Sequence, residues 1–361
     1  MRALKFMRKQ SQRKRNRVLI TGNEAIGEAA IKAGCYFYAG YPITPQNELT
    51  AYMAKKMHEE NRVFIQAESE LAAVNMVFGA SAAGMRAMTS SSSPGISLKQ
   101  EGISYLAGCQ LPAVIVNVMR GGPGLGNIGP SQSDYFQATK GGGHGDYRLI
   151  VLAPSSVQES FDLTFLAFDL ADKYRNPVMI LSDAFLGQMA ESAVIKSQER
   201  SIKNLKVKKD WILSGAKKRK PNIIRSLLLE EGALEKHNVL LQRKYKEIEK
   251  KEVRYEEINT EDAEIIFVAY GISFRIAKEA AHLLPMNVGI FRPITLWPFP
   301  YDALRRISNK RKVFVFELSA GQMLEDVCLS VGDRDKVFFY GRTGGEIFNE
   351  KELANFVLSK L

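Results

Sequence analysis

Two glutamates stand where an expected apolar strand gives way to a helix rich in small residues. They are Glu68 and Glu70, within Gln66-Ala-Glu-Ser-Glu-Leu-Ala-Ala-Val-Asn75. In the first turn of a helix, the positive end of the helix dipole stabilises a charged carboxylate by about 0.3–1 kcal/mol. Such a carboxylate can meet a heterocycle that docks over the edge of the sheet. The alternative interpretation is that both glutamates only cap the helix, as acids in first turns commonly do.

An arginine stands at the end of another apolar run. Arg120 follows the largely apolar stretch Pro112–Met119, whose composition is typical of a strand buried within a parallel sheet. The planar guanidinium group presents its N–H groups in a fork that matches the two oxygens of a carboxylate. Arg120 is therefore a candidate for binding an anionic substrate.

A proline-bracketed loop follows a third expected strand. Residues 40–45 read Gly-Tyr-Pro-Ile-Thr-Pro, so Pro42 and the second proline enclose Ile43 and Thr44. Prolines fix the backbone and remove amide donors, which predicts a rigid, extended loop before the next helix.

A run of serines follows a fourth expected strand. Residues 90–95 read Ser-Ser-Ser-Ser-Pro-Gly and form a polar turn in this interpretation. Their hydroxyl groups, including that of Ser93, either face a ligand or cap the following helix.

The elements that would position these residues alternate between strands and helices over residues 17–195. The expected strands are at residues 18–21, 36–39, 63–66, 86–89, 112–119, 149–153 and 178–181. This alternation predicts a parallel sheet with helices on both faces. Open sheets of this kind bind ligands at the carboxyl ends of their strands, where all of the residues above would lie.

The rest of the chain predicts a second, smaller parallel-sheet domain. The α/β pattern resumes over residues 263–361, with expected strands at 265–270, 288–293, 313–317 and 337–340. Residues 1–16 are a basic N-terminal arm, and residues 196–262 are a basic connector with a helical stretch. The predicted fold class is α/β with two parallel-sheet domains.

The positive charge is confined to two segments. Of the net charge of +11, residues 1–17 contribute +8 and residues 196–254 contribute +10, so the rest of the chain carries −7. Basic segments of this kind more commonly face partners or solvent than read a nucleic-acid groove. We therefore expect no nucleic-acid partner.

The cysteines and histidines do not indicate a metal site or a disulfide scaffold. Cys35, Cys109 and Cys328 are far apart and form no CxxC pair, and the four histidines show no ligand spacing. No apolar run approaches the roughly 20 residues that a membrane-spanning helix needs. The N-terminus lacks the apolar centre of a secretory signal, so we expect a cytoplasmic protein without a membrane partner.

One motif is rejected as a dinucleotide site. Gly124, Gly126 and Gly129 match the spacing GxGxxG, but Pro130 and a polar, glycine-rich run follow them. That fingerprint requires a helix to begin at the third glycine, so that its amide end meets the pyrophosphate. A long loop at the strand ends is better suited to cover a substrate.

Several motifs in order resemble one enzyme family over nearly the whole chain. They are residues 40–45, the Glu70-Leu-Ala-Ala segment, Leu111–Arg120 and Phe291-Arg-Pro-Ile-Thr-Leu-Trp-Pro298. Together they resemble the α subunit of 2-oxoacid:ferredoxin oxidoreductases. Within that family, residues 91–97 and the loop after Arg120 are most similar to the 2-ketoisovalerate (3-methyl-2-oxobutanoate) type.

The resemblance implies a thiamine-diphosphate enzyme in which this chain supplies the pyrimidine-side domain, followed by a transketolase C-terminal-like domain. Glu70 matches the carboxylate that contacts ring nitrogen N1′ and thereby helps the ring remove the C2 proton. Arg120 matches the residue that grips the substrate carboxylate, and Thr44 matches the hydroxyl beside it. Pro42, Ile43 and Ser93 are further candidates for binding the cofactor. Glu68 competes for the role of Glu70, although its position nearer the strand favours a structural one.

The resemblance also implies partner chains. The chain has no Gly-Asp-Gly motif followed by asparagine, which thiamine enzymes use to bind the diphosphate through Mg²⁺. The resemblance assigns that motif and an iron–sulfur cluster to a β subunit, with γ and δ subunits as possible further carriers. Coenzyme A would be the co-substrate and ferredoxin the electron acceptor. We therefore expect the chain alone to be catalytically silent.

The identity of the substrate and the functional class of the protein stay open at this point. Lys140 or Arg148 could bind the second carboxylate of 2-oxoglutarate, and pyruvate is a further alternative to 2-ketoisovalerate. Two hypotheses from other classes are a dehydrogenase that uses the GxGxxG loop and a non-catalytic interaction protein with basic segments.

Overall fold

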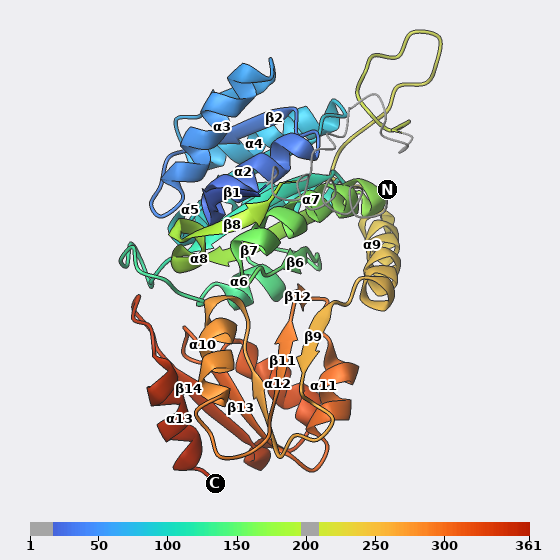
Figure 1. The fold of residues 1–361 in the computed structure, drawn as a ribbon. Helices are drawn as coiled ribbons and strands as arrows, with labels where there is room; N and C mark the ends of the chain where they lie inside the picture. The colour runs from blue at the N-terminus through green and yellow to red at the C-terminus, as the bar shows by residue number, and fades with distance from the viewer. Residues whose placement is uncertain (1–16, 196–208) are drawn as a thin grey trace, which may run out of the picture.

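The computed structural model describes residues 17–195 and 209–361, which form two α/β domains stacked end to end (Figure 1). The basic arm of residues 1–16 and the start of the connector lie outside the described residues. The two parallel-rich sheets confirm the predicted fold class.

The first domain is built on a seven-stranded sheet in the order β12-β6-β7-β5-β4-β2-β3. All neighbouring strands are parallel except β12, which pairs antiparallel with β6. The strands are β2 (Phe37–Gly40), β3 (Val63–Gln66), β4 (Ala87–Ser91), β5 (Ala113–Met119), β6 (Ile150–Leu152), β7 (Pro177–Asp183) and β12 (Thr295–Trp297).

The crossover helices of this domain bury apolar faces against its sheet. Each residue of β5 and β7 is buried, as expected for central strands covered on both sides. The helices are α2 (Gly22–Lys32), α3 (Asn47–Glu59), α4 (Glu70–Ala82), α5 (Ser93–Gly108), α6 (Tyr135–Thr139), α7 (Val157–Tyr174) and α8 (Ala184–Gln188).

The first strand of the chain does not join the main sheet. β1 (Arg17–Thr21) pairs antiparallel with β8 (Ala190–Val194) in a separate two-stranded sheet. We expected a parallel strand here. A four-residue apolar run fits either arrangement, and its partner lies about 170 residues away along the chain.

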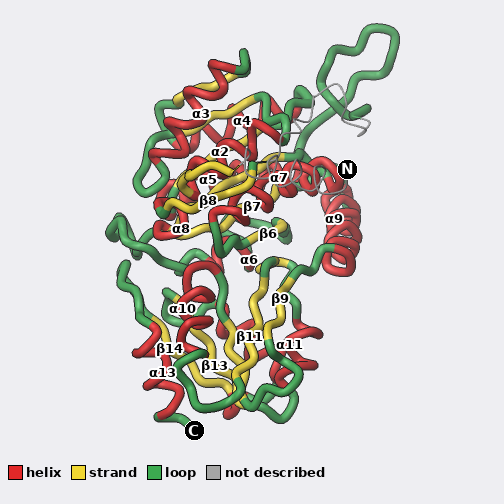
Figure 2. The backbone as a smooth tube through the Cα atoms, in the orientation of Figure 1, coloured by secondary structure: helices red, strands yellow, loops and turns green. Residues whose placement is uncertain are grey.

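The second domain has a five-stranded sheet in the order β14-β13-β10-β11-β9, parallel except for the edge strand β9. Figure 2 shows these strands flanked by helices. The strands are β9 (Tyr255–Ile258), β10 (Ile265–Val268), β11 (Val288–Pro293), β13 (Lys312–Glu317) and β14 (Val337–Gly341). The helices are α10 (Gly271–Ala281), α11 (Tyr301–Ser308), α12 (Met323–Val331), the 3₁₀ helix η2 (Arg334–Lys336) and α13 (Glu350–Leu358).

The two domains share a continuous junction. α9 (Ala233–Lys251) packs along the first domain and leads into β9, while β12 returns from the second domain to the first sheet (Figure 1). The buried amide of Gln132 bonds the carbonyl of Tyr270, the hydroxyl of Ser273 and the amide of Leu318 at 2.7–2.9 Å. These contacts hold the loop after Arg120 against the second domain.

Candidate active site

The residues singled out in the sequence lie at one edge of the first sheet. β5, β4, β2 and β3 are adjacent and parallel, so their carboxyl ends meet there. Arg120 follows β5, Ser92 and Ser93 follow β4, the loop of residues 41–46 follows β2, and Glu70 lies four residues after β3. This is the edge at which open α/β sheets bind ligands.

Glu70 is the first residue of α4 and its side chain faces inward. The hydroxyl of Ser69 caps the helix by accepting a hydrogen bond from Ala72 N at 3.1 Å, so Glu70 is not needed for capping. Glu70 is only 6% exposed, whereas Glu68 is exposed. Within the described part of the chain, no hydrogen-bond donor reaches the Glu70 carboxylate. The Glu70 oxygens are not among the fully buried atoms without a partner, so the carboxylate keeps an opening and unused hydrogen-bonding capacity at this edge of the sheet.

Gly95 and Ser91 form a small cradle around the Glu70 carboxylate. A Cβ atom placed on Gly95 would lie 2.1 Å from Ser91 Oγ and 2.6 Å from Glu70 Oε1, so any larger residue there would displace these two groups. The hydroxyl groups of Ser91 and Ser92 are buried and find no partner among the described residues. A carboxylate and two hydroxyl groups with unused hydrogen-bonding capacity therefore lie together.

Arg120 is held by backbone carbonyls and keeps donors free. Its guanidinium group bonds the carbonyl oxygens of Thr44 and Leu125, each at 2.9 Å. Its Nε is buried without a partner in the described residues. The Thr44 hydroxyl accepts a hydrogen bond from Asn47 at 3.1 Å. Pro42 in the same loop is exposed and Ile43 is half-buried.

Ser93 has a different position from Ser91 and Ser92. Its hydroxyl donates to Asp134 at 2.6 Å and accepts from the backbone N–H of Arg120 at 3.0 Å. Burial raises the pKa of Asp134, and the bonds from Ser93 and Asn117 oppose the rise. The described contacts of Ser93 thus support Arg120, and its place as a cofactor ligand stays a prediction.

The sequence analysis missed Lys99, which lies directly behind Glu70. This lysine of α5 is fully buried and its ammonium group donates to the Glu70 carbonyl oxygen at 3.2 Å and to Thr89 Oγ1 at 3.0 Å. The sequence did contain a signal. Lys99 is three residues after the buried Ile96 and four before the buried Ile103, which is the spacing of one helix face.

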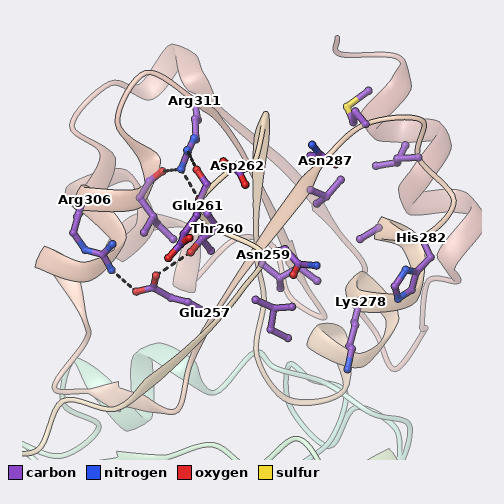
Figure 3. Close-up of a pocket in the computed structure, with 17 residues that line it drawn as sticks. Glu257, Asn259, Thr260, Glu261, Asp262, Lys278, His282, Asn287, Arg306 and Arg311 are labelled. Carbon is purple, nitrogen blue, oxygen red and sulfur yellow. Dashed lines mark hydrogen bonds and ion pairs between the residues drawn. The ribbon is translucent and has the colours of Figure 1, made fainter.

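A separate cavity of about 1020 Å³ lies in the second domain, at the amino ends of β10 and β11 (Figure 3). Several of its charged side chains are engaged: Arg306 pairs with Glu257, and Arg311 bonds the carbonyl oxygens of Thr260 and Glu261. It is not at the carboxyl ends where ligands bind in such sheets. It therefore contributes nothing to the site at Glu70.

The described residues contain neither a cluster of metal ligands nor a membrane-spanning helix. No group of three or more His, Cys, Asp or Glu side chains in them is arranged to hold a metal ion. No helix among them is both long and apolar enough to cross a membrane.

Comparison with known proteins gives matches over both domains. Residues 28–261 match the family described as pyruvate flavodoxin/ferredoxin oxidoreductase, thiamine diP-bdg. Residues 263–353 match the pyruvate:ferredoxin oxidoreductase core domain II.

Individual relatives are similar over nearly their whole length. The chain is 52% identical over 339 residues to ketoisovalerate oxidoreductase subunit VorB of Methanothermobacter marburgensis, covering 93% of this chain and 95% of the relative. It is 41% identical to 2-oxoglutarate synthase subunit KorA of Archaeoglobus fulgidus, covering 86% of this chain and 90% of the relative.

Solved structures of related proteins are similar to this chain over nearly its whole length. A 2-oxoglutarate:ferredoxin oxidoreductase from Magnetococcus marinus, with 2-oxoglutarate, coenzyme A and succinyl-CoA bound, superposes with a TM-score of 0.85 at 26% identity. The match covers 96% of this chain and 65% of that chain. A split-gene transketolase, at 16% identity and a TM-score of 0.59, shares the fold alone. The chain therefore belongs to the 2-oxoacid:ferredoxin oxidoreductases, as the motifs in its sequence predicted.

Proposed function

We propose that this chain binds the pyrimidine end of thiamine diphosphate in a heteromeric enzyme that oxidatively decarboxylates 2-ketoisovalerate. The products would be carbon dioxide, the branched acyl-CoA and reduced ferredoxin. The observation that carries the proposal is the carboxylate of the largely buried Glu70, which has no donor among the described residues and lies at the carboxyl edge of the sheet.

The residues around Glu70 fit an aminopyrimidine ring. The ring offers N–H and nitrogen groups that would satisfy the Glu70 carboxylate and the buried hydroxyl groups of Ser91 and Ser92. Gly95 leaves room for a flat group to approach the carboxylate, because any side chain there would collide with it. Pro42 and Ile43 would lie along the same edge.

Glu70 would act by holding a proton at ring nitrogen N1′. When bound, thiamine diphosphate supplies the carbon that attacks the 2-oxo group and then accommodates the electrons left behind by carbon dioxide. A carboxylate fixed at N1′ makes the amino nitrogen of the ring a better base toward that carbon. Glu70 is largely removed from solvent, which strengthens the interaction because water screens it poorly there.

Arg120 would bind the carboxylate of the 2-oxoacid. The guanidinium group already points two N–H groups at loop carbonyls and retains its buried Nε and further donors. The Thr44 hydroxyl, in the loop that Arg120 contacts, would lie beside the same carboxylate. Ser93 and Asp134 would support Arg120 from behind.

The substrate is proposed from two observations. The 52% identical relative is named as a ketoisovalerate oxidoreductase subunit. Of the two cations that could bind a second carboxylate, Lys140 is engaged in an ion pair with Asp326 of the second domain, and Arg148 donates to the Lys140 carbonyl oxygen at 3.1 Å. 2-Oxoglutarate is the second candidate, because a relative at 41% identity is named as a 2-oxoglutarate synthase subunit.

The remaining parts of the enzyme would come from other subunits. The relatives are named as subunits, and the chain has no Gly-Asp-Gly motif for a diphosphate-bound metal. We assign Mg²⁺, the diphosphate and at least one iron–sulfur cluster to a β subunit, with γ and δ subunits as further candidates. The assembled enzyme would use coenzyme A and ferredoxin in the cytoplasm.

The test is a pair of matched substitutions in the complex reconstituted with its partner subunits. Glu70→Gln keeps the size of the side chain but removes its charge, and should lower 2-oxoacid-dependent viologen reduction at least about a hundredfold. Glu68→Gln makes the same change at an exposed glutamate two residues earlier and should leave turnover unchanged. Turnover of the Glu70→Gln complex near that of wild type would refute the proposal. Side-by-side assays with 2-ketoisovalerate, pyruvate and 2-oxoglutarate decide the substrate.

A further inference from the structure

Helix α5 buries a lysine and exposes its apolar neighbour. Lys99 is 0% exposed, whereas Leu98 is 58% exposed. Burying an ammonium group costs several kcal/mol unless hydrogen bonds and a nearby negative charge compensate. A leucine or methionine at position 99 would fill the same place without that cost. The lysine therefore requires an explanation beyond packing.

The position of Lys99 places its charge beside Glu70. Gly95, one turn earlier on α5, lies against the Glu70 side chain, and Gly102, about one turn later, lies against Val74 of α4. These two glycines let α4 and α5 approach closely. Lys99 lies between them and donates to the Glu70 carbonyl oxygen at 3.2 Å, at the beginning of α4.

Glu70 is the charged neighbour that affects Lys99. Burial lowers the pKa of Lys99 to about 7, and the Glu70 charge opposes that shift. Among the described residues, no other charged group contributes noticeably to the pKa of Lys99 from α4, β4 or α5. Thr89, its other hydrogen-bond partner, is neutral. Lys99 therefore places its positive charge against the backbone of Glu70, and the Glu70 side chain carries the negative charge that opposes the lowering of the Lys99 pKa.

We propose that Lys99 is a positioning residue that acts through Glu70, holding the first turn of α4 and keeping the Glu70 carboxylate ionised until the coenzyme binds. The inference rests on the proposed function, because it assigns Lys99 a task in the binding of the aminopyrimidine ring. It adds a buried cation to a site that otherwise contains one carboxylate and neutral hydroxyl groups.

This role has a consequence that can be measured without turnover. If Glu70 is ionised before binding, the proton that it shares with N1′ must come from solution, so binding takes up about one proton per site. If the positive charge behind Glu70 is removed, part of the Glu70 population has already bound a proton. Binding then takes up fewer protons from solution.

The experiment is a calorimetric titration of the assembled apo-complex with thiamine diphosphate and Mg²⁺ at about pH 6. Comparing two buffers with different ionisation enthalpies gives the number of protons taken up. The variants are Lys99→Met, which is similar in volume, and Lys99→Gln, which keeps an N–H donor for the Glu70 carbonyl oxygen without the charge. The control is Lys55→Met, at a lysine whose side chain is 71% exposed. Thermal unfolding and assembly are checked for each variant.

We expect both Lys99 variants to lower proton uptake at least about twofold, and Lys55→Met to leave it unchanged. The acidic limb of the activity profile should move up by about one pH unit in the Lys99 variants. In a Glu70→Gln background, replacing Lys99 should have no further effect on proton uptake. If Lys99 had only a structural role, its replacement would lower stability both in the wild-type and in the Glu70→Gln background. The number of protons taken up on coenzyme binding would then stay unchanged.

Two failures can be told apart. If Glu70→Gln takes up as many protons as wild type, the proposed function fails. If Glu70→Gln abolishes uptake while a correctly assembled Lys99→Gln or Lys99→Met complex matches wild type, the role of Lys99 is overturned and the proposed function stands.

Discussion

At the residue scale, side-chain type and spacing predicted the charged groups that lie at the sheet edge. Glu70 and Arg120 follow apolar strands, and the parallel topology brings the ends of those strands together. Lys99 could not be predicted in the same way, because lysines are almost never fully buried and the sequence alone favours the solvent for them. Its spacing from Ile96 and Ile103 is a weaker signal for the inward face, and the structure shows Lys99 buried beside an exposed Leu98.

The roles of the serines after β4 could not be predicted from the sequence either. The sequence left open whether residues 90–95 face a ligand or cap a helix. In the structure, Ser91 ends a strand and Ser92 precedes a helix without capping it through its side chain. The hydroxyl groups of a serine run are chemically alike, so only the three-dimensional contacts distinguish Ser93, which supports Arg120, from its unpartnered neighbours.

A substitution of Arg120 tests its role at this scale. Arg120→Lys keeps the charge but loses the planar fork, so kcat/KM for the 2-oxoacid should fall about tenfold to a hundredfold, mainly through a higher KM. Arg305→Lys is the control, since the exposed Arg305 of α11 pairs with Asp302 in the second domain. Steady-state viologen reduction at varied 2-oxoacid measures both. An unchanged KM in Arg120→Lys would show that another group binds the substrate carboxylate.

At the element scale, the order of strands and helices was predictable, but several pairings were not. Periodicity and apolar runs locate β5, β7 and α7 closely, because long buried elements leave a strong pattern. The pairing of β1 with β8 and of β12 with β6 depends on contacts between residues far apart in the chain. Short strands carry too few residues to specify such partners.

The close approach of α4 and α5 allows a matched pair of glycine substitutions. Gly95→Ala would place a methyl group 2.6 Å from Glu70 Oε1, so it should weaken coenzyme binding and turnover at least about tenfold. Its effect on stability should be small, because alanine favours helices by about 1 kcal/mol over glycine. Calorimetry and viologen reduction measure the first effect, and urea denaturation measures the second.

Gly102→Ala is the control on the same helix. Its methyl group would lie 2.4 Å from a methyl of the buried Val74, away from the carboxylate, and should lower the free energy of unfolding by about 1–3 kcal/mol. The properly folded fraction should keep wild-type coenzyme affinity. If Gly95→Ala and Gly102→Ala had the same effect on coenzyme binding, the cradle at Gly95 would not be the pyrimidine site.

At the scale of the whole molecule, the two-domain α/β architecture followed from composition and alternation, and the family from ordered motifs. The contacts at the junction between the domains could not be predicted from the sequence. The domains are joined by hydrogen bonds from individual polar side chains, those of Gln132, Asp183 and Asp326. Isolated contacts of this kind leave no periodic signal in a sequence. The placement of β12 in the first sheet likewise depends on how the second domain docks.

Asp183 makes the stability of this junction depend on pH. Its carboxylate caps α8 and accepts a hydrogen bond from Ile272 N of the second domain, and burial raises its pKa to about 6. The folded chain therefore retains a proton that the unfolded chain releases near its ordinary value of 3.8. The stabilisation is complete below about pH 4 and is lost as the pH rises through about 6, a change of about 3 kcal/mol.

Asp183→Asn removes that titration. Urea denaturation of the isolated chain should show that the stability of the variant, measured relative to wild type, rises between about pH 4 and pH 7. The cap itself should survive, since asparagine caps helices about as well as aspartate. A difference that stays constant across this range would mean that folding does not raise the pKa of Asp183.

The account as a whole stands on a carboxylate of this chain that activates a coenzyme bound between subunits. The most direct measurement is the rate at which the C2 proton of thiamine diphosphate exchanges with deuterium in the assembled complex without 2-oxoacid, followed by quenching and NMR. We predict that Glu70→Gln slows this exchange at least about a hundredfold while Glu68→Gln leaves it at the wild-type rate. Equal exchange rates in wild type and Glu70→Gln would contradict the account.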